Sequence, residues 1–324
     1  MLIYEPSFRR LAGSIPSGIE PVLMGEDGIL RLEGREVTPE DAGAVAGWAN
    51  ADVFFGPAVR PYMVALLKSP HLRWVQSGAA GFDQPIFGQL VQKGVTLTTS
   101  HGQALGMAEY VLWGVLDHFQ RGRERRAAQG RHAWERLRFR EINGSHWLVI
   151  GYGSIGQGVA ERARAFGARI TGVRRNPAPH PAADAIAPLE DVPRLLPEAD
   201  VVVLSIPLTP ESRHLVDADF LGGMKDGSVL VNVGRGGLVD EAALLAALDA
   251  GRPEHAVLDV FETEPLPADS RFWDHPRVTL TPHASGITDG QHVRNDALFV
   301  ENLGRFARGE PLLNVADPKD VTAG

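Results

Sequence analysis

Three polar segments in the second half of the chain carry residue types suited to proton transfer and anion binding. Arg235 lies in VNVGRGGLVD, Glu264 in LDVFETEPLP and His283 in LTPHASG, and each segment contains or follows a short apolar run. An imidazole exchanges a proton near neutral pH, a neighbouring carboxylate stabilises the imidazolium, and a guanidinium binds a carboxylate through two N–H groups. The trio predicts acid–base chemistry on a small anionic substrate.

A glycine-rich segment, WLVIGYGSIGQG, carries a second chemical signal. Gly151, Gly153 and Gly156 have the G-x-G-x-x-G spacing, after an apolar run and before an amphipathic stretch. In a dinucleotide site the first glycine permits a tight turn, the second lets the backbone approach the pyrophosphate, and the third lets helix and strand pack. Ser154 and Ile155 would open the helix, whose N-terminus favours anionic phosphates. We therefore predict a dinucleotide-binding loop.

The residues after the next apolar run indicate which dinucleotide is preferred. Arg174 stands 18 residues after Gly156, and Arg175 and Asn176 follow it. An NAD site places an acidic residue there against the ribose 2′-hydroxyl, whereas guanidiniums attract a 2′-phosphate. We predict NADP (NADPH) as the cofactor and NAD as the less favoured one. The alternative is a pair of solvated arginines on a protein that prefers NAD.

Six apolar runs have the near-continuous Val/Ile/Leu character of parallel strands that are buried on both faces. We expect strands at 147–150, 169–173, 201–206, 229–233, 256–260 and 278–280, and helices at 155–166 and 240–250. This alternation predicts an α/β fold with a doubly wound parallel sheet (Rossmann). Since ligands bind at the carboxyl ends of such strands, the polar segments described above would meet at one edge.

The first hundred residues show a weaker alternation, which predicts a second, smaller α/β domain. We expect strands at 2–4, 53–55, 73–76 and 95–98, and helices at 39–49 and 58–68. Beyond residue 100, further helices are expected at 104–129 and 291–306. The last helix is expected to return to the first domain. We therefore place a flavodoxin-like α/β substrate domain at 1–100 plus 287–324, with the NADP-binding Rossmann domain, 101–286, inserted in it.

Composition narrows the class of protein. The chain has 324 residues, a net charge of −8 and no cysteine, which excludes disulfides, thiolate metal sites and a Cys nucleophile. The acidic balance argues against nucleic acid as a partner, and no apolar run approaches the roughly 18 residues of a membrane span. No cluster of residues has metal-ligand spacing, so no metal is expected. A cytoplasmic enzyme acting on a small molecule is the expectation.

These motifs, in this order, resemble the D-2-hydroxyacid dehydrogenase family, which includes glyoxylate/hydroxypyruvate reductases; the resemblance covers most of the chain and is strongest at 147–286. It implies reduction of a small 2-keto acid to the D-2-hydroxy acid by hydride transfer, in a cleft between two domains, by an enzyme that is commonly a homodimer. By position, it implies that Arg235 binds the substrate, Glu264 pairs with the histidine, and His283 is the general acid/base. The implied substrate contacts are Ala80, Gly81, Arg235 and His283, and the further cofactor contacts are Ser205, Ile206, Pro207, Val233, Gly234, Asp259 and Gly286.

Other functions remain open at this point. Phosphoglycerate or phosphite dehydrogenases use the same scaffold, whereas formate dehydrogenases carry Gln where this chain has Glu264. A non-catalytic, dinucleotide-sensing corepressor is the alternative from another class, because such proteins can retain the Arg–Glu–His set. Glu262 is expected to be solvated, Phe54 and Phe55 to line the substrate site or the core, and Trp134 to line that site or reach a partner subunit.

Overall fold

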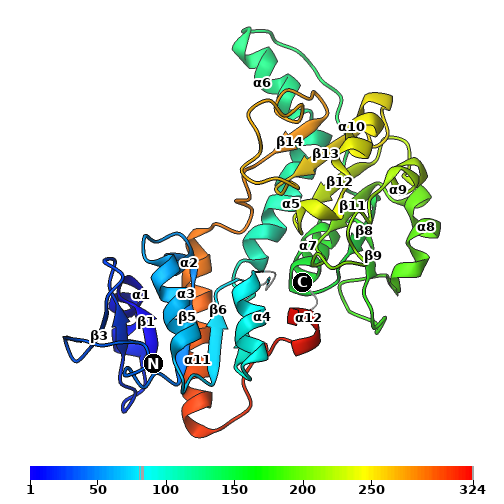
Figure 1. The fold of residues 1–324 in the computed structure, drawn as a ribbon. Helices are drawn as coiled ribbons and strands as arrows, with labels where there is room; N and C mark the ends of the chain where they lie inside the picture. The colour runs from blue at the N-terminus through cyan, green and yellow to red at the C-terminus, as the bar shows by residue number, and fades with distance from the viewer. Residues whose placement is uncertain (80, 82–83, 323–324) are drawn as a thin grey trace. The chain divides into compact units, whose positions relative to one another are not determined.

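The computed structural model describes residues 1–79, 81 and 84–322, which form two compact units. Unit 1 comprises Met1–Gln103 and Thr288–Gly324, and unit 2 comprises Ala104–Ile287. Within the described residues, each unit contains one seven-stranded sheet that is packed against helices (Figure 1).

The sheet of unit 2 is parallel at every pairing among the described residues, in the order β10-β9-β8-β11-β12-β13-β14. The strand order reverses between β8 and β11, and such a switch point is where doubly wound sheets bind their ligands. The strands are β8 His146–Ile150, β9 Arg169–Val173, β10 Ala185–Ala187, β11 Val201–Leu204, β12 Val229–Asn232, β13 His255–Leu258 and β14 Val278–Leu280. The α-helices are α5 Ala104–Phe119, α6 Gly122–Gly130, α7 Ser154–Ala165, α8 Val192–Leu195, α9 Ala218–Gly223 and α10 Glu241–Ala250.

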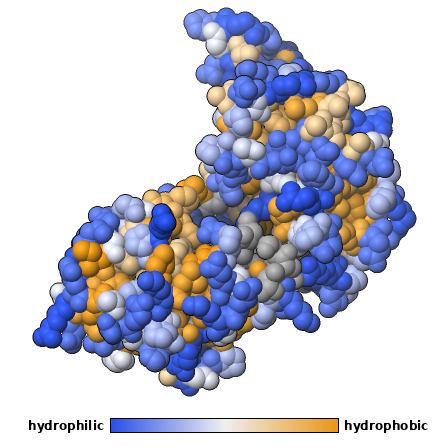
Figure 2. Space-filling view, in the orientation of Figure 1, coloured by the Kyte–Doolittle hydropathy of each residue, from blue (hydrophilic) through white to orange (hydrophobic). Residues whose placement is uncertain are grey.

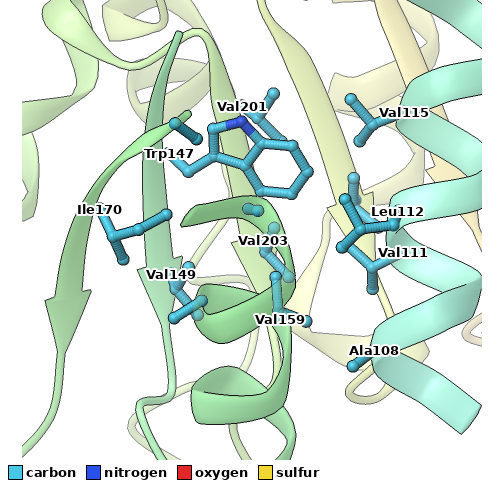
Figure 3. Close-up of a cluster of buried hydrophobic side chains, with 14 of the residues drawn as sticks. Ala108, Val111, Leu112, Val115, Trp147, Val149, Val159, Ile170, Val201 and Val203 are labelled. Carbon is cyan, nitrogen blue, oxygen red and sulfur yellow. The ribbon is translucent and has the colours of Figure 1, made fainter. Parts of the chain in front are cut away.

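Successive residues of a strand point to opposite faces of the sheet. Because the strands of this sheet are apolar at successive positions, both of its faces are apolar. In β8, Trp147 and Val149 pack in the cluster formed with α5 and α7 (Figure 3), whereas Leu148 and Ile150 belong to the cluster on the other face. Burial on both sides is what the unbroken apolar runs required. The predicted doubly wound α/β fold is confirmed.

Unit 1 has a mixed sheet in the order β4-β3-β2-β1-β5-β6-β7, in which β3 runs antiparallel to both of its neighbours, β2 and β4. Its strands are β1 Leu2–Tyr4, β2 Val22–Met24, β3 Leu30–Leu32, β4 Arg35–Glu36, β5 Ala46–Ala49, β6 Trp74–Ser77 and β7 Thr96–Thr98. Its α-helices are α1 Glu5–Leu11, α2 Ala51–Phe54, α3 Val59–Lys68, α4 Pro85–Gln92, α11 Asp289–Arg308 and α12 Pro318–Thr322. The late helix α11 belongs to this unit, where Phe299 stacks on Trp48 with ring centroids 4.6 Å apart.

The secondary structure predicted for two segments of unit 1 was wrong. The helix expected at 39–49 ends in strand β5, whose four residues are all buried, and the strand expected at 53–55 lies largely in helix α2. A strand that is buried on both faces shows no alternation of apolar and polar residues. At Gly47, helix α3 packs so closely that a Cβ there would lie 2.5 Å from the Leu66 side chain. Asn50 starts α2 by accepting a hydrogen bond from the Val53 N–H. Tertiary burial and a helix cap therefore overrode the local pattern.

The single helix expected over 104–129 is broken after Phe119. Arg121 has a left-handed backbone (φ +55°), and the Arg126 guanidinium binds back to Asp117 at 2.6 and 2.9 Å. The second piece, α6, and the segment without regular structure that follows it extend away from the sheet of unit 2 (Figure 1). This α6 region is mainly hydrophilic on the face shown in Figure 2. In the described part of the chain, no helix combines the length and the apolar character needed to cross a membrane.

Candidate active site

The glycine loop lies between β8 and α7, and two of its glycines are required by the protein's own packing. Gly151 has φ +101°, and a Cβ there would lie 2.6 Å from the Ser205 backbone. A Cβ at Gly156 would lie 2.2 Å from the Gly151 carbonyl oxygen. Gly153 differs, because a Cβ there would meet no atom within 4 Å. Its position at the uncapped N-terminus of α7 fits the close approach of an anionic ligand to the backbone.

The loop after β11 lies directly beside the glycine loop. The Ser205 N–H donates to the Ile150 carbonyl, and the Ser205 hydroxyl donates to the Gly151 carbonyl, both at 2.8 Å. The next predicted contacts, Ile206 and Pro207, continue from there. These bonds join the two strands that flank the switch point, which is the position that the Rossmann prediction required for a cofactor loop.

The basic residues after β9 form a short, internally bonded loop. The Arg174 guanidinium donates to the Ala178 carbonyl, and its Nε is buried with no hydrogen-bond partner in the described structure. Arg175 and Asn176 are exposed. The pKa of Glu211 is lowered, mainly by a hydrogen bond from the Thr209 side chain and one from the backbone of Glu211 itself. The positive charge of Arg175 lowers it further. The Arg175 charge therefore acts on the loop that follows β11.

The loop after β12 is shaped by a residue to which the sequence assigned no role. Asn232 is buried; its side-chain oxygen accepts from the Gly234 N–H at 3.0 Å, and its amide donates to the Arg235 carbonyl at 2.9 Å. Val233 is buried, and a Cβ at Gly234 would lie 2.8 Å from the Ile206 carbonyl oxygen. The partly buried Arg235 guanidinium donates to the Gly234 carbonyl at 2.8 Å. Asn232 is a polar residue at the end of a buried, otherwise apolar strand, and this feature of the sequence could have indicated its role.

Asp259, at the end of β13, holds the loop that carries the histidine. Its carboxylate accepts from the Thr281 hydroxyl at 2.6 Å and from the N–H groups of Ala284 and Ser285 at 2.8 and 3.0 Å. Its carbonyl accepts from the His283 N–H at 2.7 Å, and the residue is 1% exposed. The geometry makes Asp259 an organiser of this loop; its predicted contact with a cofactor, like that of Gly286, stays a prediction.

Glu264 and His283 are in direct contact. Glu264 Oε2 lies 2.7 Å from His283 Nδ1, and Glu264 Oε1 accepts from the Phe261 N–H at 3.0 Å. Because an ionised carboxylate only accepts hydrogen bonds, the Nδ1–H donates and Nε2 is left for proton exchange. His283 has a left-handed backbone (φ +51°) in a loop anchored by Asp259. The arrangement fixes both the tautomer and the orientation of the imidazole.

The three predicted catalytic residues follow three neighbouring strands, β12, β13 and β14. The loop of Arg235 also packs on that of Glu264, since a Cβ at Gly236 would lie 1.9 Å from the Phe261 carbonyl carbon. Gly81 lies in unit 1, after β6, and Ala80 lies outside the described residues. Unit 2 therefore gathers a glycine loop, a guanidinium and a carboxylate–imidazole pair along the carboxyl ends of its strands.

Other residues that the sequence singled out are placed as follows. Glu262, expected to be solvated, has its Oε1 2.6 Å from His214 Nε2. Phe54 packs edge-on to Phe87 in the core of unit 1, whereas Phe55 is exposed. Trp134 lies in the segment after α6 and is 94% exposed. Among the residues that the structure describes, no group of three or more His, Asp or Glu is placed to hold a metal ion.

A family model described as the NAD binding domain of D-isomer specific 2-hydroxyacid dehydrogenases matches residues 112–285, which lie within unit 2. A glyoxylate reductase from Aeropyrum pernix is 34% identical over 267 residues, which cover 79% of this chain and 79% of that protein. A D-3-phosphoglycerate dehydrogenase from Methanocaldococcus jannaschii is 32% identical over 259 residues, which cover 78% of this chain but 49% of that protein. The chain thus spans about half the length of this second relative.

A solved structure shows the same similarity. The NADPH-dependent glyoxylate/hydroxypyruvate reductase from Sinorhizobium meliloti, in complex with NADP and sulfate, superposes with a TM-score of 0.78 and 25% sequence identity. The match covers 99% of this chain and 99% of that chain. The similarity therefore includes both units, in addition to the range matched by the family model.

Proposed function

Because this chain belongs to the D-isomer specific 2-hydroxyacid dehydrogenase family, we propose that it reduces a small 2-keto acid, of the glyoxylate or hydroxypyruvate type, to the D-2-hydroxy acid with NADPH. The observation that carries the proposal is the 2.7 Å contact between Glu264 and His283 at the carboxyl edge of the sheet. In the reduction of a ketone, negative charge grows on the carbonyl oxygen, and a positioned imidazolium protonates it. The D configuration is an analogy with the family.

Each residue of the set has a chemical task in this proposal. NADPH, when bound, supplies the hydride. His283 delivers a proton from Nε2 to the carbonyl oxygen, while Glu264 holds Nδ1–H and stabilises the imidazolium. Arg235 binds the carboxylate or the developing oxyanion with fixed N–H donors. Gly81, and Ala80 outside the described residues, stay predicted contacts of the substrate carboxylate. In the reverse direction His283 is the base.

The cofactor is proposed to lie against the loops after β8, β9, β11 and β12. Of Gly151, Gly153 and Gly156, Gly153 is the one that packing does not explain, which supports a pyrophosphate contact with the first turn of α7, including Ser154 and Ile155. Ser205 and the loop to Pro207, with Val233 and Gly234, extend this surface past the switch point. Arg174, Arg175 and Asn176 would receive the ribose 2′-phosphate, and the similar NADP-bound reductase supports NADPH over NADH.

Removing the guanidinium of Arg175 tests the cofactor preference. We expect the Arg175→Ala variant to lose about 10–100-fold in kcat/KM for NADPH and little for NADH, because a hydrogen bond to a charged group contributes about 1.5–3 kcal/mol. Steady-state rates with both cofactors give the ratio. Arg194→Ala is the matched control, since Arg194 is an exposed arginine of unit 2 bound to Asp191. A wild-type enzyme that prefers NADH would contradict the NADP assignment.

The function itself is tested by NADPH consumption with glyoxylate, hydroxypyruvate, pyruvate and bulkier 2-keto acids. Turnover with a small 2-keto acid supports the proposal. NADPH binding without turnover of any acid would favour a dinucleotide sensor. Reduction of added NAD⁺ or NADP⁺ by 3-phosphoglycerate or phosphite, in the absence of keto-acid reduction, would favour a different dehydrogenase on this scaffold. The last comparison matters because one relative is named a phosphoglycerate dehydrogenase.

We further propose a homodimer formed through unit 2. Trp113 and Phe166 line a groove of about 570 Å³ beside α5 and α7, and they are 46% and 52% exposed. Large exposed apolar side chains that cluster at a groove are typical of protein interfaces, and a second copy of the chain is the occupant we propose.

Analytical ultracentrifugation tests the dimer. The wild-type chain should sediment at twice its monomer mass, and Trp113→Ala should weaken association by about 10-fold or more, since a buried Trp at an interface contributes about 2 kcal/mol or more. Trp273→Ala is the control, because Trp273 is 48% exposed in the same unit but donates its indole N–H to Pro267. A monomeric wild-type protein would contradict the proposal.

A further inference from the structure

A second histidine–carboxylate pair lies beside the one assigned to proton transfer. His214 Nε2 and Glu262 Oε1 are 2.6 Å apart, and both side chains are partly exposed. His214 lies in the loop between β11 and α9, which begins at Ser205, and Glu262 lies two residues before Glu264. The pair thus joins the loop after β11 to the loop after β13.

Backbone contacts tie a third loop to this pair. The His214 N–H donates to the Gly237 carbonyl at 2.9 Å, in the loop of Arg235. On the other side, a Cβ at Gly236 would lie 2.4 Å from the Glu262 nitrogen, and the Glu262 N–H donates to Glu241 Oε1 at 2.8 Å. The three loops that carry predicted cofactor and catalytic residues therefore converge on His214 and Glu262.

The local charges explain why a histidine is suited to this position. Glu241, Glu262 and Glu264 are three acidic residues in or next to one loop, and Glu241 bonds to the Glu262 backbone. Burial raises the pKa of Glu241, and the charge of Glu262 raises it further. A neighbouring imidazole offsets this repulsion when it is protonated and still donates one hydrogen bond when it is neutral.

We propose that His214 and Glu262 are positioning residues, which hold the 261–264 turn so that Glu264 keeps its bond to His283 and which link that bond to the cofactor-side loop. This inference rests on the proposed function. The turn is anchored at its inner end by the bond from the Phe261 N–H to Glu264, and the His214 bond restrains its middle. Without that restraint Glu264 moves away from Nδ1, and a small displacement of a catalytic group lowers the rate steeply.

The test compares variants that differ in one hydrogen-bond donor. His214 has a left-handed backbone (φ +52°), so His214→Ala and His214→Gln carry a similar backbone strain, and only Gln keeps an N–H donor for Glu262. We expect kcat to fall by about 10-fold in His214→Ala, with unchanged NADPH affinity, and to recover in His214→Gln. The double variant His214→Ala/Glu262→Ala should be no slower than the slower single variant, because both changes break one contact.

A spectroscopic readout separates this inference from the proposed activity. In the wild-type protein, ¹⁵N NMR of neutral His283 should show the Nδ1–H tautomer, and His214→Ala should increase the Nε2–H tautomer. If the protein consumes NADPH with none of the keto acids, the proposed function fails, but the tautomer shift still tests the pair. An unchanged tautomer together with an unchanged kcat in His214→Ala, or strictly additive losses in the double variant, would overturn the inference.

Discussion

Replacing His283 with asparagine should lower keto-acid turnover by about 10²–10⁴-fold, the usual contribution of a general acid. The reason is geometric: Nδ1 is bound to Glu264 at 2.7 Å, so Nε2 is the ring atom that can deliver the proton, and an amide cannot replace it. Asparagine is chosen because φ at residue 283 is +51°, a conformation that Asn tolerates better than Ala. Steady-state rates with the best keto acid and NADPH measure the loss.

Two comparisons make this experiment decisive. NADPH affinity, measured by fluorescence titration, should be unchanged, because the variant removes a proton donor and leaves the glycine loop intact. His71→Asn is the control for the loss of an imidazole, since His71 is an exposed histidine of unit 1. Near-normal turnover in the asparagine variant would mean that another group donates the proton.

Replacing Arg235 with lysine should lower kcat/KM by about 10²–10³-fold, comparable to the removal of one oxyanion donor. Lysine keeps the positive charge but loses the planar fork, and the guanidinium also donates to the Gly234 carbonyl at 2.8 Å within its own loop. If Arg235 binds mainly the substrate carboxylate, the loss appears in KM; if it stabilises the developing charge, the loss appears in kcat. Initial rates over a range of keto-acid concentrations distinguish the two.

The matched control for this change is Arg271→Lys. Arg271 belongs to the same unit and bonds to Asp249 at 2.9 Å, but it takes no part in the candidate site. Unchanged kinetics are therefore expected for it. An Arg235→Lys variant with normal kcat and normal KM would remove Arg235 from the proposed set.

The strands of unit 2 could be located from the sequence because their requirement is local. A strand such as β8 that is covered on both faces must be apolar along its length, and this is visible in WLVI. The glycine spacing is equally local, since Gly151 and Gly156 are needed within a single turn and the helix that follows it. The order of the motifs then placed Arg235, Glu264 and His283 after neighbouring strands.

The two wrong predictions in unit 1 arose where the local sequence pattern does not decide the secondary structure. In the segment around Ala46–Ala49, small residues are mixed with Trp48, and the apolar spacing suggested a helix. Only the packing of α3 against Gly47 and the capping of α2 by Asn50 decide the outcome. Both interactions depend on partners that the local pattern does not specify.

By itself, the sequence determined the type of sheet in unit 2, the glycine loop and the residues able to exchange a proton or bind an anion. Only the tertiary structure decided how these residues are held. Asn232 shapes the Arg235 loop, Asp259 anchors the His283 loop, and His214 meets Glu262 across two loops. The reason is that side-chain types follow from local requirements of burial and backbone conformation, whereas hydrogen bonds between distant loops exist only after the strands have paired.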